Sequence, residues 1–263
     1  MNQVEPVGAG VSGRLWEDKV AIVTGGSQGI GAAIAEQGVA DGARVWIFDI
    51  ADHEGQQTAE RIGDHCHFLH VDVTDEQSIA DAVAEVVGDA GRVDILVNNA
   101  SGDGDDDALT MTVASWDSHM RLNLTSAWLM ARAVLPSMIE TGGGSIVNIG
   151  SLHSRMTAEG AFPYAAGKAG LGGLTRTLAL DYGPQGVRVN MVCPGWTRSE
   201  RIEAHFAEIG DEAVAAIVAT HALRRVATPQ DIAPVVSFIA SDHASFITAA
   251  TLDVDGGLSA RFA

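Results

Sequence analysis

Residues 19–31 read KVAIVTGGSQGIG, and this stretch decides how the chain folds. A run of apolar residues ends at Thr24, and a helical pattern begins near Gly29. Glycines permit a tight turn and let a ligand approach the backbone, while the helix N-terminus favours an anion such as a pyrophosphate. For the glycines alone a plain structural turn is the alternative, but the strand before them and the helix after them predict a dinucleotide-binding turn. The residues expected to contact the dinucleotide are Gly25, Ser27, Gln28, Gly29, Ile30 and Gly31.

Short apolar runs alternate with helical patterns along the rest of the chain. The expected strands are Lys19–Thr24, Arg44–Phe48, Cys66–Val71, Asp94–Val97, Ser145–Ile149, Val187–Val192 and Thr251–Val254. The expected helices span residues 29–41, 75–90, 114–140, 164–183 and 229–241. This alternation predicts one Rossmann-like α/β domain, a doubly wound parallel sheet of about seven strands with helices on both faces. We expect the domain to span 14–263, after a loose arm over 1–13, with a substrate lid around 198–228.

Composition restricts the partners of the protein. The 263 residues carry a formal net charge of -18, which repels nucleic acid and anionic membranes, so neither is an expected partner. No run of about 18 apolar residues is present, so no membrane-spanning helix is expected. Cys66 and Cys193 lie in apolar, strand-like runs, and two buried, reduced thiols fit the cytoplasm, where we expect the protein to act.

Neither the histidines nor the acidic loop predicts a metal site. The nine histidines show no spacing typical of metal ligands. The acidic loop resembles a fragment of a calcium loop, but it lacks the closing glutamate, so a solvated loop is expected. Its carboxylates are Asp103, Asp105, Asp106 and Asp107.

Asp49 ends the second expected strand and indicates the kind of dinucleotide. A carboxylate there accepts hydrogen bonds from the adenosine ribose and repels a 2′-phosphate. No Arg or Lys occurs in the glycine turn or directly after Asp49, where Ile50 and Ala51 stand. The sequence therefore favours NAD over NADP, with Ile50 beside the ribose; a role as a helix cap is the alternative for Asp49. Asp72 and Val73, after the third strand, are expected to contact the adenine, although spacing alone fits a turn aspartate nearly as well.

Two further segments supply polar groups at strand ends. Asn98, Asn99, Ala100 and Ser101 follow the fourth strand, where a short amide can brace neighbouring backbone and a small residue leaves room for the cofactor. Without context these residues indicate only a turn.

Tyr164 and Lys168 are four residues apart at the start of an expected helix, which places both side chains on one face. A tyrosine with its ordinary pKa of about 10 is a poor base at neutral pH unless a nearby positive charge stabilises the phenolate. Ser151, after the fifth strand, can donate to a substrate oxygen. Asn123 is unusual in a helix interior, and holding a water beside Lys168 would explain it.

This pattern resembles the short-chain dehydrogenase/reductase family over about residues 14 to 257. The family's glycine motif resembles residues 24–31, and its Asn-Asn-Ala-Gly motif resembles residues 98–101, with Ser101 in place of the glycine. Its catalytic Asn, Ser, Tyr and Lys fall on Asn123, Ser151, Tyr164 and Lys168.

The resemblance implies a role for each of these residues. Tyr164 would be the general acid and base, Lys168 would lower its pKa and bind the nicotinamide ribose, and Ser151 would orient the substrate oxygen. Asn123 would anchor a water that relays protons. The segment after the sixth strand would line the nicotinamide with Pro194, Gly195, Thr197 and Ser199, while His153 and Trp196 would face the substrate. The implied activity is hydride transfer between NAD(H) and the CH–OH group of a secondary alcohol or the corresponding ketone.

Other functions remain open from the sequence. A dinucleotide sensor or scaffold has the same fold without chemistry, and a dehydratase or epimerase uses similar residues. The identity of the small-molecule substrate is also open.

The expected helix 164–183 contains Gly167, Gly170, Gly172 and Gly173. Each costs roughly 1 kcal/mol relative to alanine in a helix interior, so close packing must compensate. The resemblance implies that this helix and helix 114–140 pair with their copies in a second subunit, and we expect a homotetramer; burial within one subunit is the alternative.

Overall fold

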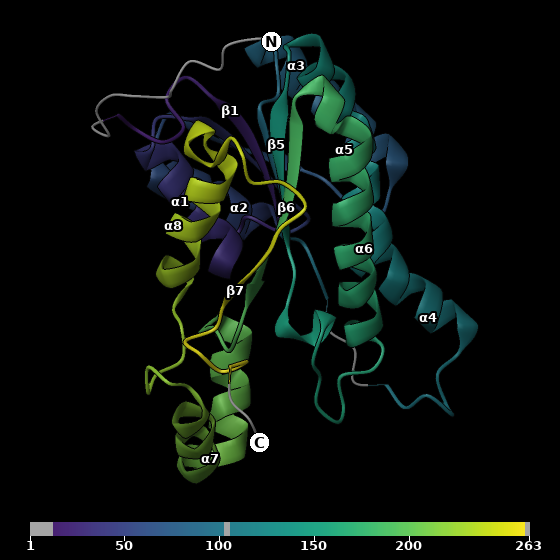
Figure 1. The fold of residues 1–263 in the computed structure, drawn as a ribbon, viewed down its shortest axis with the longest axis vertical. Coiled ribbons are helices and arrows are strands. Elements are labelled where there is room, and N and C mark those ends of the chain that lie inside the picture. The colour runs from purple at the N-terminus through teal and green to yellow at the C-terminus, as the bar shows by residue number, and fades with distance from the viewer. Residues whose placement is uncertain (1–12, 103–105, 261–263) are drawn as a thin grey trace, which may run out of the picture.

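The protein forms a seven-stranded, all-parallel sheet between two layers of helices (Figure 1). This computed structural model describes residues 13–102 and 106–260. The strands are β1 (Val20–Thr24), β2 (Arg44–Asp49), β3 (Cys66–His70), β4 (Ile95–Asn98), β5 (Gly144–Ile149), β6 (Val187–Pro194) and β7 (Thr251–Val254). Their order across the sheet is β3-β2-β1-β4-β5-β6-β7, so strands are added in one direction from β1 to β3 and in the opposite direction from β4 onward. The predicted doubly wound fold is confirmed.

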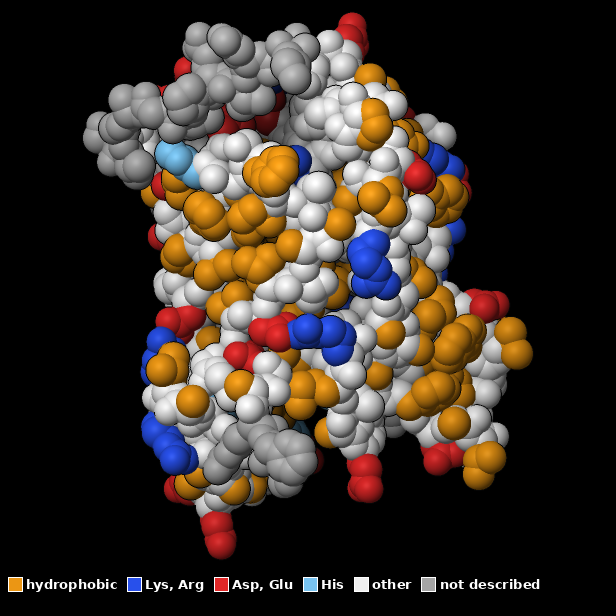
Figure 2. Space-filling view, viewed as in Figure 1, with side chains coloured by type: hydrophobic (Ala, Val, Ile, Leu, Met, Phe, Trp, Pro, Cys, Tyr) orange, Lys and Arg blue, Asp and Glu red, His pale blue; other side chains and the backbone are white. Residues whose placement is uncertain are grey.

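Helices cover both faces of the sheet. On one face lie α1 (Gly29–Ala40), α2 (Asp52–Ile62) and α8 (Pro229–Ala240); on the other lie α3 (Glu76–Ala90), α5 (Ser126–Glu140) and α6 (Tyr164–Tyr182) (Figure 1). α4 (Val113–Met120) precedes α5, and α7 (Glu200–Thr220) lies beyond one end of the sheet, at the bottom of the view. Figure 2 shows hydrophobic side chains gathered over the α4 end, where Val113 is 76% exposed.

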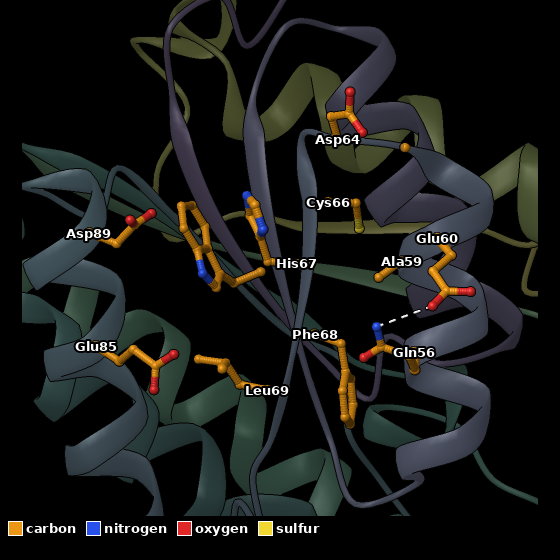
Figure 3. A pocket seen from close by; sticks show the side chains of 12 residues that line it. Gln56, Ala59, Glu60, Asp64, Cys66, His67, Phe68, Leu69, Glu85 and Asp89 are labelled. Atoms are coloured by element: carbon orange, nitrogen blue, oxygen red, sulfur yellow. Dashed lines mark hydrogen bonds between the residues drawn. The ribbon is translucent and has the colours of Figure 1, made fainter.

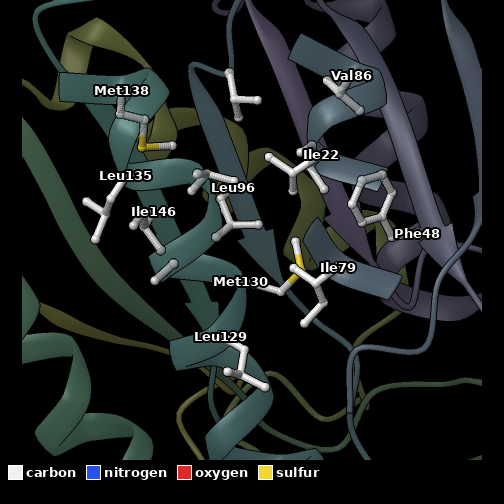
Figure 4. Close-up of a cluster of buried hydrophobic side chains, with 14 of the residues drawn as sticks. Ile22, Phe48, Ile79, Val86, Leu96, Leu129, Met130, Leu135, Met138 and Ile146 are labelled. Atoms are coloured by element: carbon white, nitrogen blue, oxygen red, sulfur yellow. The ribbon is translucent and has the colours of Figure 1, made fainter. Parts of the chain in front are cut away.

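The central strands are buried on both faces, which explains their nearly continuous apolar sequence. On the α3, α5 and α6 face, the core residues shown in Figure 4 include Ile22, Leu96, Met130 and Ile146. Alternate strand residues such as Val23 and Val97 pack against α1 and α8 on the other face.

Three helical segments differ from those expected. α2 was not predicted, because its sequence is mostly polar and includes Gly55. The expected helix 114–140 is divided by a five-residue π-helix, Arg121–Thr125. Within the lid segment, α7 breaks at Gly210, whose φ of 82° and ψ of 166° are not helical.

One of the two edges of the sheet is formed by β3. A hollow of about 730 Å³ runs along it between α2 and α3. Figure 3 shows carboxylates on both sides of the strand, with Glu85 and Asp89 on one wall and Glu60 and Asp64 on the other. Acidic walls discourage pairing of this edge with another strand, and the hollow is separate from the glycine turn.

The cysteines, the helices and the acidic loop can also be compared with the expectations from the sequence. Both cysteines are buried and free. No helix among the described residues is long and apolar enough to cross a membrane, and no described cluster of His, Cys, Asp or Glu could hold a metal ion. Asp106 contacts His119 and Ser115, whereas Asp103 and Asp105, like most of the expected N-terminal arm, lie outside the described residues.

Candidate active site

The glycine turn after β1 is shaped so that side chains are excluded from it. Gly25 and Gly29 have φ values of 62° and 57°, which disfavour other residues. A Cβ on Gly31 would lie 2.1 Å from the carbonyl oxygen of Gly25. The Ser27 hydroxyl is buried without a hydrogen-bond partner in the described part of the chain. A tight turn, an unpartnered hydroxyl and the free amides at the start of α1 fit a diphosphate.

Thr24 and Asn99 fix this turn to the neighbouring strand. The Thr24 hydroxyl accepts hydrogen bonds from the amides of Asn99 and Ala100, both at 3.0 Å. The Asn99 side chain donates to the carbonyls of Thr24 and Gly25 at 3.0 and 2.9 Å. Asn98 instead donates to Asn148 and to the carbonyl of Ala127. Sequence reasoning gave Thr24 no role, although a hydroxyl directly before the glycines was the available signal.

The Asp49 carboxylate lies beside the glycine turn. One oxygen accepts from the Ser27 amide at 3.1 Å, and the other accepts from the amides of Ile50 and Ala51 at 2.8 and 3.2 Å. The residue does not cap α2, whose N-cap is Ala51 and has no side-chain hydrogen bond. These bonds hold a negative charge where the sequence predicts the ribose, and Ile50 is 65% exposed beside it.

Asp72 and Val73 have different surroundings, because Asp72 forms a turn and Val73 is buried in the core. Asp72 accepts from the amide and the hydroxyl of Thr74 at 2.8 and 2.7 Å, which is the geometry of a turn aspartate. Val73 is 6% exposed and belongs to the core. Their contact with adenine stays a prediction.

Ser151, Tyr164 and Lys168 meet at the carboxyl ends of β5 and β6. The Lys168 ammonium is buried, donates to the carbonyl of Ile149 at 2.9 Å and lies 5.5 Å from the centre of the Tyr164 ring. Burial lowers the pKa of Lys168 to about 8. Burial also raises the pKa of the half-buried Tyr164 phenol, while its hydrogen bond with Ser151 acts in the opposite direction.

Asn123 lies at the centre of the π-helix and is 3% exposed. Its side-chain oxygen accepts from the Gly102 amide at 3.2 Å, and its nitrogen donates to the carbonyl of His119 at 3.1 Å. A Cβ on Gly167 would lie 2.9 Å from the Cβ of Asn123, so the π-helix packs directly beside Lys168. Protein partners therefore explain the polar residue, and its water-holding role stays a prediction.

The segment after β6 lies over the glycine turn. A Cβ on Gly29 would be 3.7 Å from the Cβ of Ser199, which caps α7 by accepting from the Ile202 amide. Pro194 ends β6, a Cβ on Gly195 would lie 3.0 Å from the Cα of Asp255, and the Thr197 hydroxyl donates to the Gly195 carbonyl. The structure thus brings Ser199, at the end of this segment, to the glycine turn.

Two groups of aromatic side chains lie near the predicted substrate side, one at Tyr164 and one at Trp196. The His153 ring meets Tyr164 edge to face at 5.8 Å, bonds to the Thr157 hydroxyl at 2.8 Å, and has its pKa lowered by burial. Trp196 stacks parallel to His205 of α7 with centroids 6.0 Å apart, and it also contacts Phe206. Phe206 is the buried residue of α7, so the first half of this helix packs on Trp196.

Cys193 lies beside Ser151 and Ser154, whereas the sequence predicted only that it is a buried thiol. Its sulfur lies 3.7 Å from the Ser154 hydroxyl, and a Cβ on Gly150 would be 2.9 Å from it. Burial raises the pKa of Cys193, so the thiol behind Ser151 stays uncharged at neutral pH.

Comparison with known proteins gives consistent matches. A family model described as enoyl-(acyl carrier protein) reductase matches residues 25–259. The 3-oxoacyl-[acyl-carrier-protein] reductase FabG of Salmonella typhimurium is 37% identical over 243 residues, which cover 92% of this chain and 98% of the relative. Oxidoreductase UcpA of the same organism is 36% identical over 247 residues, 91% of this chain and 94% of its own.

A solved structure agrees with these relatives. The crystal structure of a protein from Sinorhizobium meliloti 1021, described as a short-chain alcohol dehydrogenase, superposes with a TM-score of 0.88. The two sequences are 32% identical, and the match covers 94% of this chain and 98% of the other.

Proposed function

Since the chain belongs to the short-chain dehydrogenase/reductase family, we propose that it transfers a hydride between NAD(H) and a secondary alcohol or ketone. The observation that supports this most directly is the meeting of Ser151, Tyr164 and Lys168 next to the Asn123 π-helix. These four side chains are the ones a proton-transfer site of this family needs.

Tyr164 acts as the general acid and base. In alcohol oxidation its phenolate takes the hydroxyl proton, and in ketone reduction its phenol returns one. Ser151, already bonded to Tyr164, stabilises charge on the substrate oxygen. When bound, the nicotinamide supplies the hydride or accepts it.

The burial of the site explains why it depends on its cofactor. Burial raises the pKa of Tyr164 and lowers that of Lys168, and both shifts oppose a phenolate–ammonium pair. The positive charge of an oxidised nicotinamide favours the phenolate, so we expect Tyr164 to become a competent base only in the loaded enzyme.

Asp49 supports NAD as the cofactor. Its carboxylate is held by three backbone amides, so it cannot easily turn away from a 2′-phosphate.

Several relatives are named as 3-oxoacyl-[acyl-carrier-protein] reductases, and reduction of a 3-oxoacyl thioester is therefore the second candidate reaction. A non-catalytic dinucleotide sensor, a dehydratase and an epimerase are the remaining alternatives.

One assay separates these possibilities. Purified protein is given NAD(H) or NADP(H) with secondary alcohols, free ketones or a 3-oxoacyl thioester, and kcat/KM is compared. We expect the highest kcat/KM with NAD(H) and an alcohol or ketone. A higher value with the thioester favours the second candidate, conversion of substrate without net change in NADH indicates a dehydratase or epimerase, and binding of NADH without any turnover indicates a sensor.

Self-association belongs to the same proposal. Exposed apolar side chains on the expected contact helices, Trp128 of α5 at 42% and Leu180 of α6 at 74%, support a homotetramer. The glycines of α6 support a homotetramer less strongly than the sequence suggested. A Cβ on Gly167 or Gly170 would collide with Asn123 or Leu124 of the same chain, so packing within one subunit already accounts for these two glycines.

A further inference from the structure

A chain of buried hydrogen bonds crosses the core between α5 and α6. Asn98, at the end of β4, donates through its side-chain nitrogen to the side-chain oxygen of Asn148 on β5 at 2.9 Å. Asn148 donates in turn to the Thr175 hydroxyl on α6 at 2.9 Å, and this hydroxyl donates to the carbonyl of Leu171 at 2.8 Å. At the other end, Asn98 also donates to the carbonyl of Ala127 on α5 at 3.3 Å. The chain therefore joins two strands and two helices.

The three side chains of this hydrogen-bond chain are buried. Asn98 is 7% exposed, Asn148 1% and Thr175 0%. The side-chain oxygen of Asn98 has no partner among residues 13–102 and 106–260, so the fold keeps this polar chain at a cost. Apolar side chains would fill the same space without that cost. Hydrogen bonds, however, fix distance and direction between the elements that they join, which apolar contacts do much less.

α6 is fastened to β5 at two neighbouring strand residues. Thr175 bonds to Asn148, and the Lys168 ammonium donates to the carbonyl of Ile149 at 2.9 Å. Thr175 follows Lys168 by seven residues, which is about two helical turns, so both side chains leave α6 on the same face. The bond between Thr175 and Asn148 therefore holds the helix in place on the strand, and Lys168 reaches its carbonyl from a fixed position.

The other end of the chain holds α5 near the π-helix that carries Asn123. Ala127 lies in the first turn of α5, which follows the π-helix directly. The π-helix and α6 touch closely, because a Cβ on Gly167 would lie 2.9 Å from the Cβ of Asn123 and one on Gly170 would lie 2.8 Å from Cδ2 of Leu124. Contacts this close require the two helices to keep one position relative to each other.

We propose that Asn148 and Thr175 set the position of α6 on the sheet and so act as positioning residues for the proton-transfer groups of that helix. Those groups are Tyr164, the first residue of α6, and Lys168 one turn later. The proposal rests on the proposed function, in which these two side chains carry the proton transfer. Since a misplacement of about 1 Å can cost about 10²-fold in rate, loss of one bond in the chain should lower kcat.

Thr175→Val tests the proposal, because it keeps the shape of the side chain and removes the hydroxyl. We expect kcat to fall about tenfold or more, with KM and the Kd for NADH changed less than about twofold. Thr175→Ser keeps the hydroxyl and should retain most of the activity. Ser241→Ala is the control: it removes an equally buried hydroxyl that donates to the Phe238 carbonyl of α8, and it should leave kcat unchanged. Asn148→Ala removes the same bond from the strand and should act like Thr175→Val.

A second readout needs no turnover and separates positioning from a merely structural role. Lys168→Met is made in the unaltered protein and in Thr175→Val, and urea unfolding is measured over a range of pH. The stability difference within each pair changes with pH only between the folded pKa of Lys168, about 8, and its ordinary value of 10.5. If Thr175 holds α6 in place, its loss lets the ammonium reach water, and the lower limit of this range should move toward 10.5.

Other titrating groups do not disturb this comparison. Within the described ranges, Tyr164 of α6 and Cys193 of β6 are the titratable side chains that act on the Lys168 ammonium. Both are present in each member of a pair, so their titrations contribute to both.

Three results would overturn the proposal: unchanged kcat in Thr175→Val, equal loss of kcat in Thr175→Ser, or a pH range of the Lys168 difference that does not move. In the last case the hydroxyl supports only the fold. Absence of turnover in the unaltered protein would instead contradict the proposed function, and the unfolding comparison would still decide whether Thr175 places Lys168.

Discussion

The ammonium nitrogen of Lys168 lies 5.5 Å from the centre of the Tyr164 ring, and it is buried rather than solvated. A charge in this position is costly to the fold but close enough to stabilise a phenolate. The pair therefore couples the stability of the protein to its proposed chemistry, and the two effects can be measured separately.

Removing the Tyr164 hydroxyl tests the acid and base directly. Tyr164→Phe should lower kcat by about 10²-fold or more, with NADH affinity retained, because proton transfer in the transition state contributes on this scale. Steady-state kinetics and fluorescence titration of NADH measure the two quantities. Tyr182→Phe, at the far end of α6, is the matched control and should keep full activity. Near-normal turnover of Tyr164→Phe would remove Tyr164 from the mechanism.

Replacing Lys168 should stabilise the fold at neutral pH. Its pKa is about 8 in the folded protein against 10.5 ordinarily, so between these values the unfolded chain binds more protons and stability rises with pH. At about pH 7, Lys168→Met should be more stable by at most about 3 kcal/mol, less the cost of the unpaired Ile149 carbonyl. The gain should shrink toward zero near pH 10.5.

Urea unfolding at both pH values measures this difference. Lys19→Met, which removes a surface ion pair with Asp242, should change stability little at either pH. A stability difference between Lys168→Met and the unaltered protein that stays the same from about pH 7 to pH 10.5 would show that the buried ammonium carries no penalty. The variant should also be inactive.

Asp49→Ala should relax cofactor choice. Loss of the charge removes repulsion of the 2′-phosphate, and the ratio of kcat/KM for NADP to that for NAD should rise about tenfold or more, since 1.4 kcal/mol corresponds to that factor. Asp52→Ala, which removes the neighbouring carboxylate bonded to His70, should leave the ratio unchanged. If the unaltered enzyme already prefers NADP, the argument from Asp49 fails.

Gly31→Ala should abolish NADH binding. Its Cβ would lie 2.1 Å from the Gly25 carbonyl oxygen, so the turn must open. Gly88→Ala in α3 is the control, because its Cβ meets nothing within 4 Å. That change should raise stability by up to about 1 kcal/mol and leave NADH affinity alone. Fluorescence titration decides the outcome, and tight binding by Gly31→Ala would place the dinucleotide elsewhere.

Sedimentation equilibrium at micromolar concentration should give a mass several times 27.4 kDa. Leu180→Glu should lower this mass, because it places a charge on the exposed side of α6. Leu223→Glu, at a similarly exposed leucine outside that helix, should not. A stable, active monomer would contradict the tetramer.

The strands and the glycine turn were predictable because their signals are local. Every expected strand lies within two residues of an observed one, since a two-sided sheet imposes continuous apolar runs. α2 was missed for an equally local reason: it is polar, and Gly55 argues against a helix. The glycine is required by tertiary packing, because a Cβ there would lie 2.2 Å from the Phe68 ring on β3.

Contacts between distant segments could not be read from the sequence. Nothing in the pattern of residues 114–140 distinguishes the π-helix from the α-helix around it. The stacking of Trp196 on His205 and the crowding of Gly167 against Asn123 depend on how separate segments cross in space. Residue types at the site were therefore foreseeable, while their supporting contacts were not.

The π-helix at Arg121–Thr125 also affects how the chain tolerates changes in length. A π-turn holds one residue more than the α-turn that it replaces, and one residue corresponds to about 100° of rotation around a helix. Deleting Leu124 would turn the π-turn into a regular α-turn and keep α4 and α5 in register, yet it would shift Asn123, inside the turn, away from Gly102 and Gly167. At this position a more regular backbone and a complete site exclude one another, so a deletion that improves the helix should inactivate the enzyme.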